Sequence, residues 1–154
     1  MSYLLTFFMD LRPSKSLLEG RMILTKDGDL VDVYIATSGA PGWQNRHNVA
    51  IKGKGAIPAT WDVELEKWEV ETKPIPMPHK KGIEGNFYAI KPFTVQIDGF
   101  TRGDFGIHAD ANVPGSAGCI VLPPKGNGWR EFQEAMKAIA LEGVSRIPLQ
   151  VAYC

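Results

Sequence analysis

"TKDGDLVDVYIATSG", residues 25–39, is the stretch that most clearly indicates the fold of this chain. Two runs rich in β-branched and aromatic residues flank the pair Asp27-Gly28. An Asp-Gly pair readily adopts the positive φ angles of a two-residue hairpin turn. The pattern therefore predicts an antiparallel pair of strands at residues 21–25 and 30–37.

Glycine and proline divide the rest of the chain into similarly short stretches. The 154 residues include 16 glycines and 11 prolines, which favours strands and turns over long helices. Residues 73–85 are expected to form a surface loop, because their alternating prolines cannot donate the hydrogen bonds of a β-ladder. Further strands are expected at residues 3–8, 60–70, 86–90, 93–97, 105–108, 118–122 and 147–152.

One stretch, residues 128–143, has the spacing of an amphipathic helix, and Gly143 is suited to its end. The predicted buried face carries Trp129, Phe132, Met136, Ile139 and Ala140. The expected fold class is therefore mainly β, a sandwich or barrel with one helix in the C-terminal half. A chain of this length favours a single domain over residues 1–154.

Composition excludes several classes of protein. Hydrophobic residues make up 44% and charged residues 22% of the chain, which is typical of a folded globular domain. The 17 Lys and Arg residues balance 17 Asp and Glu residues, so no overall field favours nucleic acid as a partner. No apolar run approaches the roughly 20 residues of a membrane span. No spacing of Cys, His and carboxylate residues indicates a metal, and no cofactor is expected.

The N-terminal apolar run, residues 4–9, is too short for a Sec-type signal peptide and lacks the basic residues that would precede one. We expect a first β-strand there, and a protein made in the cytoplasm without a Sec-type leader.

The two cysteines, Cys119 and Cys154, leave two interpretations open. They form a disulfide, or Cys119 stays free and acts as a nucleophile. A thiol attacks as its thiolate and needs a base, for which His108 is the natural candidate. If strands 105–108 and 118–122 are antiparallel neighbours across the loop at 110–115, both side chains reach one end of the sheet.

Small residues around Cys119 favour its reactivity, because residues 115–118 leave room for a substrate chain. The backbone N–H groups of Gly118 and Cys119 are candidate donors to an oxyanion, and the hydroxyl of Ser116 is a further candidate donor. A third group would orient the imidazole of His108. The carbonyl of Ala109 and the carboxylate of Asp110 are both candidates.

"GIHA" at 106–109 followed by "GSAGCIVL" at 115–122 resembles the catalytic stretch of the L,D-transpeptidases. These cysteine enzymes cross-link or trim bacterial peptidoglycan. "GKGAIPATW" at 53–61 is similar to a strand entry of the same family, and the resemblance spans roughly residues 20–125. It implies that Cys119 is the nucleophile, that His108 is the base and that the substrates are peptidoglycan stem peptides.

Three features depart from most cell-wall members of this family. The spacer between His108 and Cys119 is shorter, and Ala117 stands where many members have a second histidine. Val121 stands where many have an arginine associated with substrate binding. Arg102 is a candidate to replace that arginine, with Arg46 as an alternative, and Trp43 is a further candidate substrate contact. The substrate contacts expected from the chain are thus Gly118, Ala109, Asp110, Trp43 and Arg102.

The short spacer is more similar to compact members that are delivered as antibacterial effectors. The resemblance then implies delivery by a secretion or injection apparatus, action in the periplasm or cell wall, and an immunity protein as a partner. The expected function is transferase or hydrolase chemistry on stem peptides, as an L,D-transpeptidase or L,D-carboxypeptidase, through a thioester on the cysteine. The alternative is a non-catalytic binding or structural module of a phage tail or contractile injection apparatus.

Overall fold

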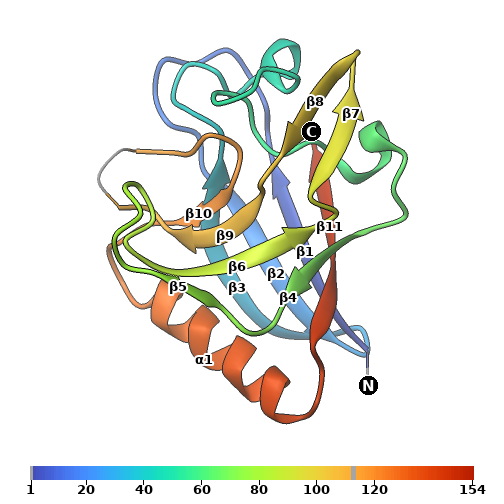
Figure 1. The fold of residues 1–154 in the computed structure, drawn as a ribbon, viewed down its shortest axis with the longest axis vertical. Helices are drawn as coiled ribbons and strands as arrows, with labels where there is room; N and C mark the ends of the chain where they lie inside the picture. The colour runs from blue at the N-terminus through green and yellow to red at the C-terminus, as the bar shows by residue number, and fades with distance from the viewer. Residues whose placement is uncertain (1, 112–113) are drawn as a thin grey trace.

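The structure of the protein is a computed structural model that describes residues 2–111 and 114–154. It is mainly β with one α-helix, as the sequence predicts (Figure 1). The strands are β1 (Tyr3–Met9), β2 (Gly20–Lys26), β3 (Asp29–Ser38), β4 (Trp68–Glu71), β5 (Ile75–Met77), β6 (Gly85–Lys91), β7 (Thr94–Ile97), β8 (Phe100–Gly103), β9 (Gly106–Ala109), β10 (Ile120–Leu122) and β11 (Arg146–Tyr153). The helix α1 spans Gly128–Leu141, and short 3₁₀ turns lie at Arg46–Asn48 and Thr60–Val63.

The main sheet closes into a barrel, which settles the choice between sandwich and barrel. Its strands run in the order β4-β11-β1-β2-β3-β10-β9-β6-β5, and β4 pairs with β6 as well as with β11. This second pairing joins the two sides of the sheet. Strand β5 lies on the outer edge of β6, and β7 and β8 form a separate hairpin. Only the pairs β1–β11 and β9–β10 are parallel among the described strands.

Alternating side chains fill the barrel, and α1 covers its lower end in the view of Figure 1. On β1, Tyr3, Leu5, Phe7 and Met9 are buried while the residues between them are more exposed, as expected for strands with one face in a core. From α1, Phe132 packs edge-on against Tyr34 and Tyr88. The remaining buried side chains of α1 are Met136 and Ile139.

The two local predictions that rest on glycine are confirmed. Asp27 and Gly28 have φ angles of 51° and 85° in the turn between β2 and β3. Gly143 has a φ of 89° and donates its N–H to the carbonyl of Ala140 at 3.0 Å, just after α1. Both positions need a left-handed backbone, which glycine adopts without a steric cost.

The predicted strand at 60–70 is largely wrong. A 3₁₀ turn occupies Thr60–Val63, and the strand begins only at Trp68. Trp68 is fully buried, and its ring N–H donates to the carbonyl of Pro58 at 3.3 Å, whereas Trp61 is 66% exposed. The alternation of apolar and polar residues around Trp61 therefore predicted a strand where a 3₁₀ turn lies, because the local pattern did not show which tryptophan enters the core.

Two short strands were missed. Ile75–Met77 pairs with β6 inside the stretch predicted to be a loop. It is an edge strand, where a proline that cannot donate is tolerated. Phe100–Gly103 forms a hairpin with β7 across Asp98 and Gly99, both of which have positive φ angles.

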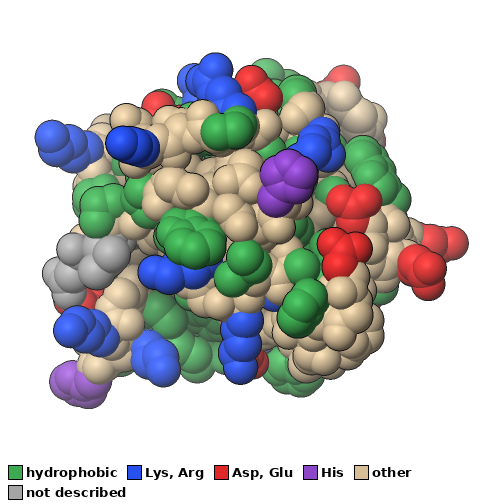
Figure 2. Space-filling model, turned by 90° about the horizontal axis from the view of Figure 1, so that it is seen from above, with side chains coloured by type: hydrophobic (Ala, Val, Ile, Leu, Met, Phe, Trp, Pro, Cys, Tyr) green, Lys and Arg blue, Asp and Glu red, His purple; other side chains and the backbone are tan. Residues whose placement is uncertain are grey.

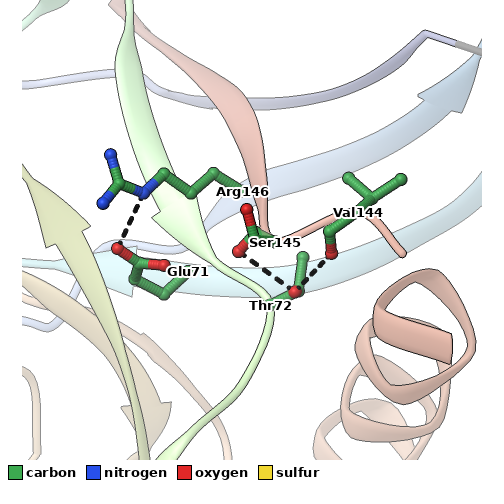
Figure 3. A network of polar contacts seen from close by, with 5 residues as sticks. All are labelled: Glu71, Thr72, Val144, Ser145 and Arg146. Atoms are coloured by element: carbon green, nitrogen blue, oxygen red, sulfur yellow. Dashed lines mark hydrogen bonds and ion pairs between the residues drawn. The ribbon is translucent and has the colours of Figure 1, made fainter. Parts of the chain in front are cut away.

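A polar network fixes the point where β4 meets β11 (Figure 3). The hydroxyl of Thr72 lies 2.7 Å from the carbonyl oxygen of Val144 and 3.1 Å from that of Ser145. Next to it, Arg146 Nε lies 2.9 Å from Glu71 Oε1. These contacts hold the strand that closes the barrel to the segment that follows α1. Among the described helices, none is long and apolar enough to cross a membrane.

Leu149 and Leu141 form a matched pair for testing the core. Leu149 is completely buried on β11, whereas Leu141 is 80% exposed at the end of α1. We expect Leu149→Ala to lower the free energy of unfolding by about 3 kcal/mol, because it leaves a cavity in the core. Leu141→Ala should change it by less than about 0.5 kcal/mol. Urea denaturation measures both, and equal losses would contradict the described core.

Candidate active site

His108 lies on β9, where it is buried, and Cys119 directly precedes the neighbouring strand β10. Strands β9 and β10 are parallel, with Ile107 opposite Ile120 and His108 opposite Val121. The expected antiparallel arrangement is wrong. Part of the predicted loop at 110–115, residues 112 and 113, lies outside the described residues.

The register fixes the relation of the two candidate catalytic residues. Ile107 and Ile120 face the core cluster, so His108 points to the other side of the wall, because strand side chains alternate. Cys119 directly precedes Ile120, the first residue of β10, so it lies one residue before the strand to which this alternation applies. The pairing places His108 on the strand next to the one that Cys119 precedes, and no hydrogen bond or ring contact joins the two side chains among the described residues.

The imidazole of His108 is held in one orientation by the backbone. Its Nδ1 lies 2.8 Å from the carbonyl oxygen of Ala109. A carbonyl can only accept, so Nδ1 carries the proton and Nε2 is left as an acceptor. Burial lowers the pKa of His108, against the raising effects of the Ala109 carbonyl and the Asp110 charge. The ring is therefore neutral at pH 7, in the form that a general base requires.

Asp110 anchors the loop and does not orient the ring. Its Oδ2 accepts the N–H of Gly115 at 3.0 Å, and its own N–H donates to the carbonyl of Leu122 at 2.8 Å. Burial raises the pKa of Asp110, partly offset by the Gly115 hydrogen bond and by His108. Of the two candidates left open by the sequence, the carbonyl of Ala109 is thus the group in contact with the imidazole.

The surroundings of Cys119 disfavour its thiolate. Burial raises the pKa of Cys119 to about 11, while a backbone contact with Gly106 and the charge of Arg102 act in the opposite direction. The sulfur donates to the carbonyl oxygen of Asp104 at 3.7 Å. Among the contacts of the described residues, no hydrogen bond joins it to His108. Cys119 and Cys154 are both free, so the disulfide interpretation does not hold here.

Ser116 organises the turn at residues 116–119, called here the Cys119 turn. Its hydroxyl donates to the carbonyl of Cys119 at 2.5 Å and accepts the N–H groups of Gly39 and Gly118 at 3.1 and 3.2 Å. A hydroxyl has one proton and two lone pairs, so its capacity is filled. The structure therefore gives Ser116 a positioning role in place of the predicted donation to substrate.

Gly118 is also engaged within the protein. Its N–H donates to Ser116, and its carbonyl accepts the hydroxyl of Ser38 at 3.0 Å. Of the two N–H groups expected to bind an oxyanion, that of Cys119 is the one left as a candidate. Ser38 also contributes to this region, although no motif in the sequence indicates it. It is completely buried at the end of β3, and its hydroxyl accepts the N–H of Ile57 at 2.9 Å.

Other protein atoms occupy the space next to the small residues that precede Cys119. A Cβ on Gly115 would come within 2.5 Å of the carbonyl oxygen of Gly39, and one on Gly118 within 2.3 Å of Arg102 Nη2. These positions are small because other parts of the chain approach closely. The expectation that they leave room for substrate is therefore corrected at Gly115 and Gly118.

Arg102 is 2% exposed, and its guanidinium donates to backbone carbonyls. The acceptors are Val49, Gly55, Ala56 and Ala117. Burial lowers the pKa of Arg102, against the raising effects of Tyr153 and Cys119. Because these contacts use its terminal nitrogens, the predicted contact of Arg102 with substrate is replaced by a contact with the protein backbone.

Trp43 lies on the loop next to these elements and is 38% exposed. Its ring is 5.8 Å from Lys54 Nζ, and the backbone of Ala40 on the same loop bonds to that of Lys54. No described contact joins Trp43 to Cys119. Seen from the end opposite α1, hydrophobic side chains are scattered among charged ones, with Lys and Arg mostly at the left and centre of the view and Asp and Glu gathered at its right edge (Figure 2).

The structure adds Phe87 to the site, which the sequence did not indicate. Its ring stacks on that of His108 with centroids 6.1 Å apart. A Cβ on Gly106 would come within 2.1 Å of the same ring. Phe87 therefore lies against β9, with its ring over Gly106 and beside the imidazole of His108.

Other places that could bind ligands lie apart from this pair. A cavity of about 670 Å³ between α1 and β6 is lined by residues that include Lys73, Tyr88, Lys137 and Leu141, but by neither Cys119 nor His108. Within residues 2–111 and 114–154, no three His, Cys, Asp or Glu side chains are grouped as metal ligands.

Comparison of the chain with models of protein families, with curated proteins and with solved structures finds no match. The assignment of function therefore depends on the residues of the site and their geometry.

The role of Ser116 can be tested by removing its hydroxyl. We expect Ser116→Ala to lower the free energy of unfolding by about 2 kcal/mol, because two N–H groups and one carbonyl lose their partner. Ser16→Ala is the control, since Ser16 is exposed, and should change stability by less than about 0.5 kcal/mol. Urea denaturation of both variants gives the comparison. An unchanged midpoint for Ser116→Ala would show that the hydroxyl does not hold the turn.

Proposed function

We propose that the protein is a cysteine-dependent acyl-transfer enzyme of the L,D-transpeptidase or L,D-carboxypeptidase type, acting on peptidoglycan stem peptides. The observation that carries the proposal is an imidazole held through Nδ1 by the carbonyl of Ala109, on the strand that pairs with the one Cys119 directly precedes. The resemblance of residues 106–109 and 115–122 to the L,D-transpeptidases supplies the substrate class.

In the proposed reaction, Cys119 Sγ attacks the carbonyl carbon of the bond between meso-diaminopimelate and D-alanine. The thiol proton passes to His108 Nε2, and the carbonyl oxygen becomes an oxyanion that accepts the N–H of Cys119. The imidazolium then returns the proton to the amine of D-alanine as the C–N bond breaks. A thioester remains on Cys119. Transfer to water completes carboxypeptidase chemistry, and transfer to an acceptor amine completes transpeptidation.

The proposal requires the sulfur to leave the carbonyl of Asp104. A cysteine side chain has three staggered χ1 positions, and a change between them moves Sγ without moving the backbone. We propose that substrate binding favours the position nearest His108, because catalytic hydrogen bonds often shorten only in the complex with substrate.

A second candidate is a non-catalytic module of a phage tail or contractile injection apparatus. The raised pKa of Cys119 favours it, since burial disfavours the thiolate. The hydrogen bond from the thiol to Asp104 favours it as well. Under either proposal the resemblance to compact effectors suggests a secretion or injection apparatus as partner. The enzyme proposal adds action in the periplasm or cell wall and an immunity protein.

The enzyme is tested with purified muropeptides that carry tetrapeptide stems, with products identified by mass. We expect release of D-alanine, exchange of the terminal residue or cross-linked dimers. Cys119→Ala should reduce product at least about 1000-fold, and His108→Gln about 100-fold or more. Cys154→Ala and His79→Gln change exposed residues and should retain activity. No product from the unmodified protein would favour the non-catalytic module, and equal activity in Cys119→Ala would contradict Cys119 as the nucleophile.

The pH dependence of kcat/KM tests the base. Burial places the pKa of His108 below its ordinary value of 6.5. The neutral ring, which accepts the thiol proton, is present above that pKa and is lost as pH falls through it. We therefore expect kcat/KM for D-alanine release to decline on the acid side with a midpoint below 6.5. An acid midpoint above 6.5 would contradict a buried neutral imidazole as the base.

A further inference from the structure

Arg102 joins two loops beside the candidate nucleophile. It comes from β8, and its side chain is 2% exposed. Nη1 donates to the carbonyls of Val49 and Ala56, and Nη2 donates to those of Gly55 and Ala117, three of the four at 3.1 Å. Four of the five guanidinium N–H groups therefore donate to backbone carbonyls. One set of carbonyls belongs to the loop at 49–56, and the other belongs to the Cys119 turn.

The charge of this guanidinium has no carboxylate partner among the described residues, whose two ion pairs are Arg130–Glu134 and Arg146–Glu71. Its stabilisation comes from carbonyl dipoles and from the ring of Phe105, whose centroid is 5.1 Å from Cζ. Burying a charge without a counterion is costly, and neutral hydrogen-bonding side chains can also hold loops together. The position of the charge therefore calls for an explanation beyond loop packing.

Nη2 of Arg102 lies against the Cys119 turn. It bonds to the carbonyl of Ala117, and it lies 2.3 Å from the place where a Cβ on Gly118 would stand. The sulfur of Cys119 comes one residue later. The charges of Arg102 and of a Cys119 thiolate act on one another in the attractive direction. Asp104, the acidic residue that acts on the same thiol, has the opposite and larger effect.

We propose that Arg102 is the positioning residue of Cys119: it fixes the Cys119 turn through the Ala117 carbonyl and places a positive charge, itself without a carboxylate partner among the described residues, next to that turn. This charge favours the anionic sulfur and the oxyanion that forms next to it. The catalytic part rests on the function proposed above, whereas the charge beside the thiol does not. The loop at 49–56 is tied to the nucleophile by the same side chain.

Ser38 provides a structural control, because it joins the Cys119 turn to the residue that follows the loop at 49–56 without a charge. Its hydroxyl donates to the carbonyl of Gly118 and accepts the N–H of Ile57. Ser38→Ala loosens the Cys119 turn and leaves the charge in place. Arg102→Gln removes the charge. Arg130→Gln removes the same unit of charge from an exposed ion pair on α1.

The experiment compares the alkylation of Cys119 by iodoacetate, which is negative, with alkylation by iodoacetamide, which is neutral. All variants carry Cys154→Ser, so that only Cys119 reacts, and thermal melting confirms that each is folded. A positive charge beside the sulfur raises the ratio of the iodoacetate rate to the iodoacetamide rate. A change in packing alone slows or speeds both reagents and leaves the ratio unchanged.

We expect Arg102→Gln to lower this ratio about fivefold, while Arg130→Gln changes it less than about twofold because its charge is exposed and screened. Arg102→Lys, which keeps the charge, and Ser38→Ala should stay within about twofold of the parent. Equal ratios in Arg102→Gln and Arg130→Gln would overturn the proposal. So would a fall in Ser38→Ala as large as that in Arg102→Gln.

If Arg102→Gln does not fold, Asp104→Asn tests the same point, because it removes the opposing charge near the thiol. In that variant, the ratio for the folded protein must exceed the ratio in urea at least about threefold, and equality overturns the proposal. Neither reagent is a substrate. A missing muropeptide activity together with the expected ratios would therefore remove the enzyme and keep the charge beside Cys119. Muropeptide activity together with the same alkylation ratio in Arg102→Gln and Arg130→Gln would keep the enzyme and remove the proposed role of the Arg102 charge.

Discussion

The parallel pairing of β9 with β10 is the constraint on which the candidate site depends. A parallel connection must carry the chain back along the whole first strand, and it usually takes a dozen or more residues with a helix. Here residues 110–119 make the return. A connection this short needs internal support, and Asp110 and Ser116 provide it by binding the backbone of the connection itself. The same pairing places His108 on the strand next to the one that Cys119 precedes.

Close packing around this connection changes the meaning of its small residues. In the sequence, Gly115 and Gly118 suggest open space beside a reactive sulfur. In the structure, the carbonyl of Gly39 and the guanidinium of Arg102 occupy that space. Small size here permits the approach of other protein groups, and those groups place the thiol.

Local signals in the sequence predicted the parts of the fold that local interactions determine. The turn at Asp27-Gly28 and the end of α1 at Gly143 depend on the φ angle of one or two residues, and both were predicted. His108 and Cys119 were predicted as a catalytic pair from the spacing of their motif, and that pairing stays a prediction. The direction of β10 relative to β9 and the four carbonyls around Arg102 depend on contacts between distant segments. No residue pattern within either strand specifies them.

A protonated thiol in the resting protein is compatible with catalysis if the thiol ionises during attack. The pKa of Cys119 is about 11 and that of His108 lies below 6.5. Moving the proton from the group with the higher pKa to the group with the lower one is therefore uphill for the isolated groups. The attraction between thiolate and imidazolium lowers this cost once both have formed. Under the proposed function, burial of the sulfur thus favours a neutral pair that ionises during attack over a thiolate in the resting state.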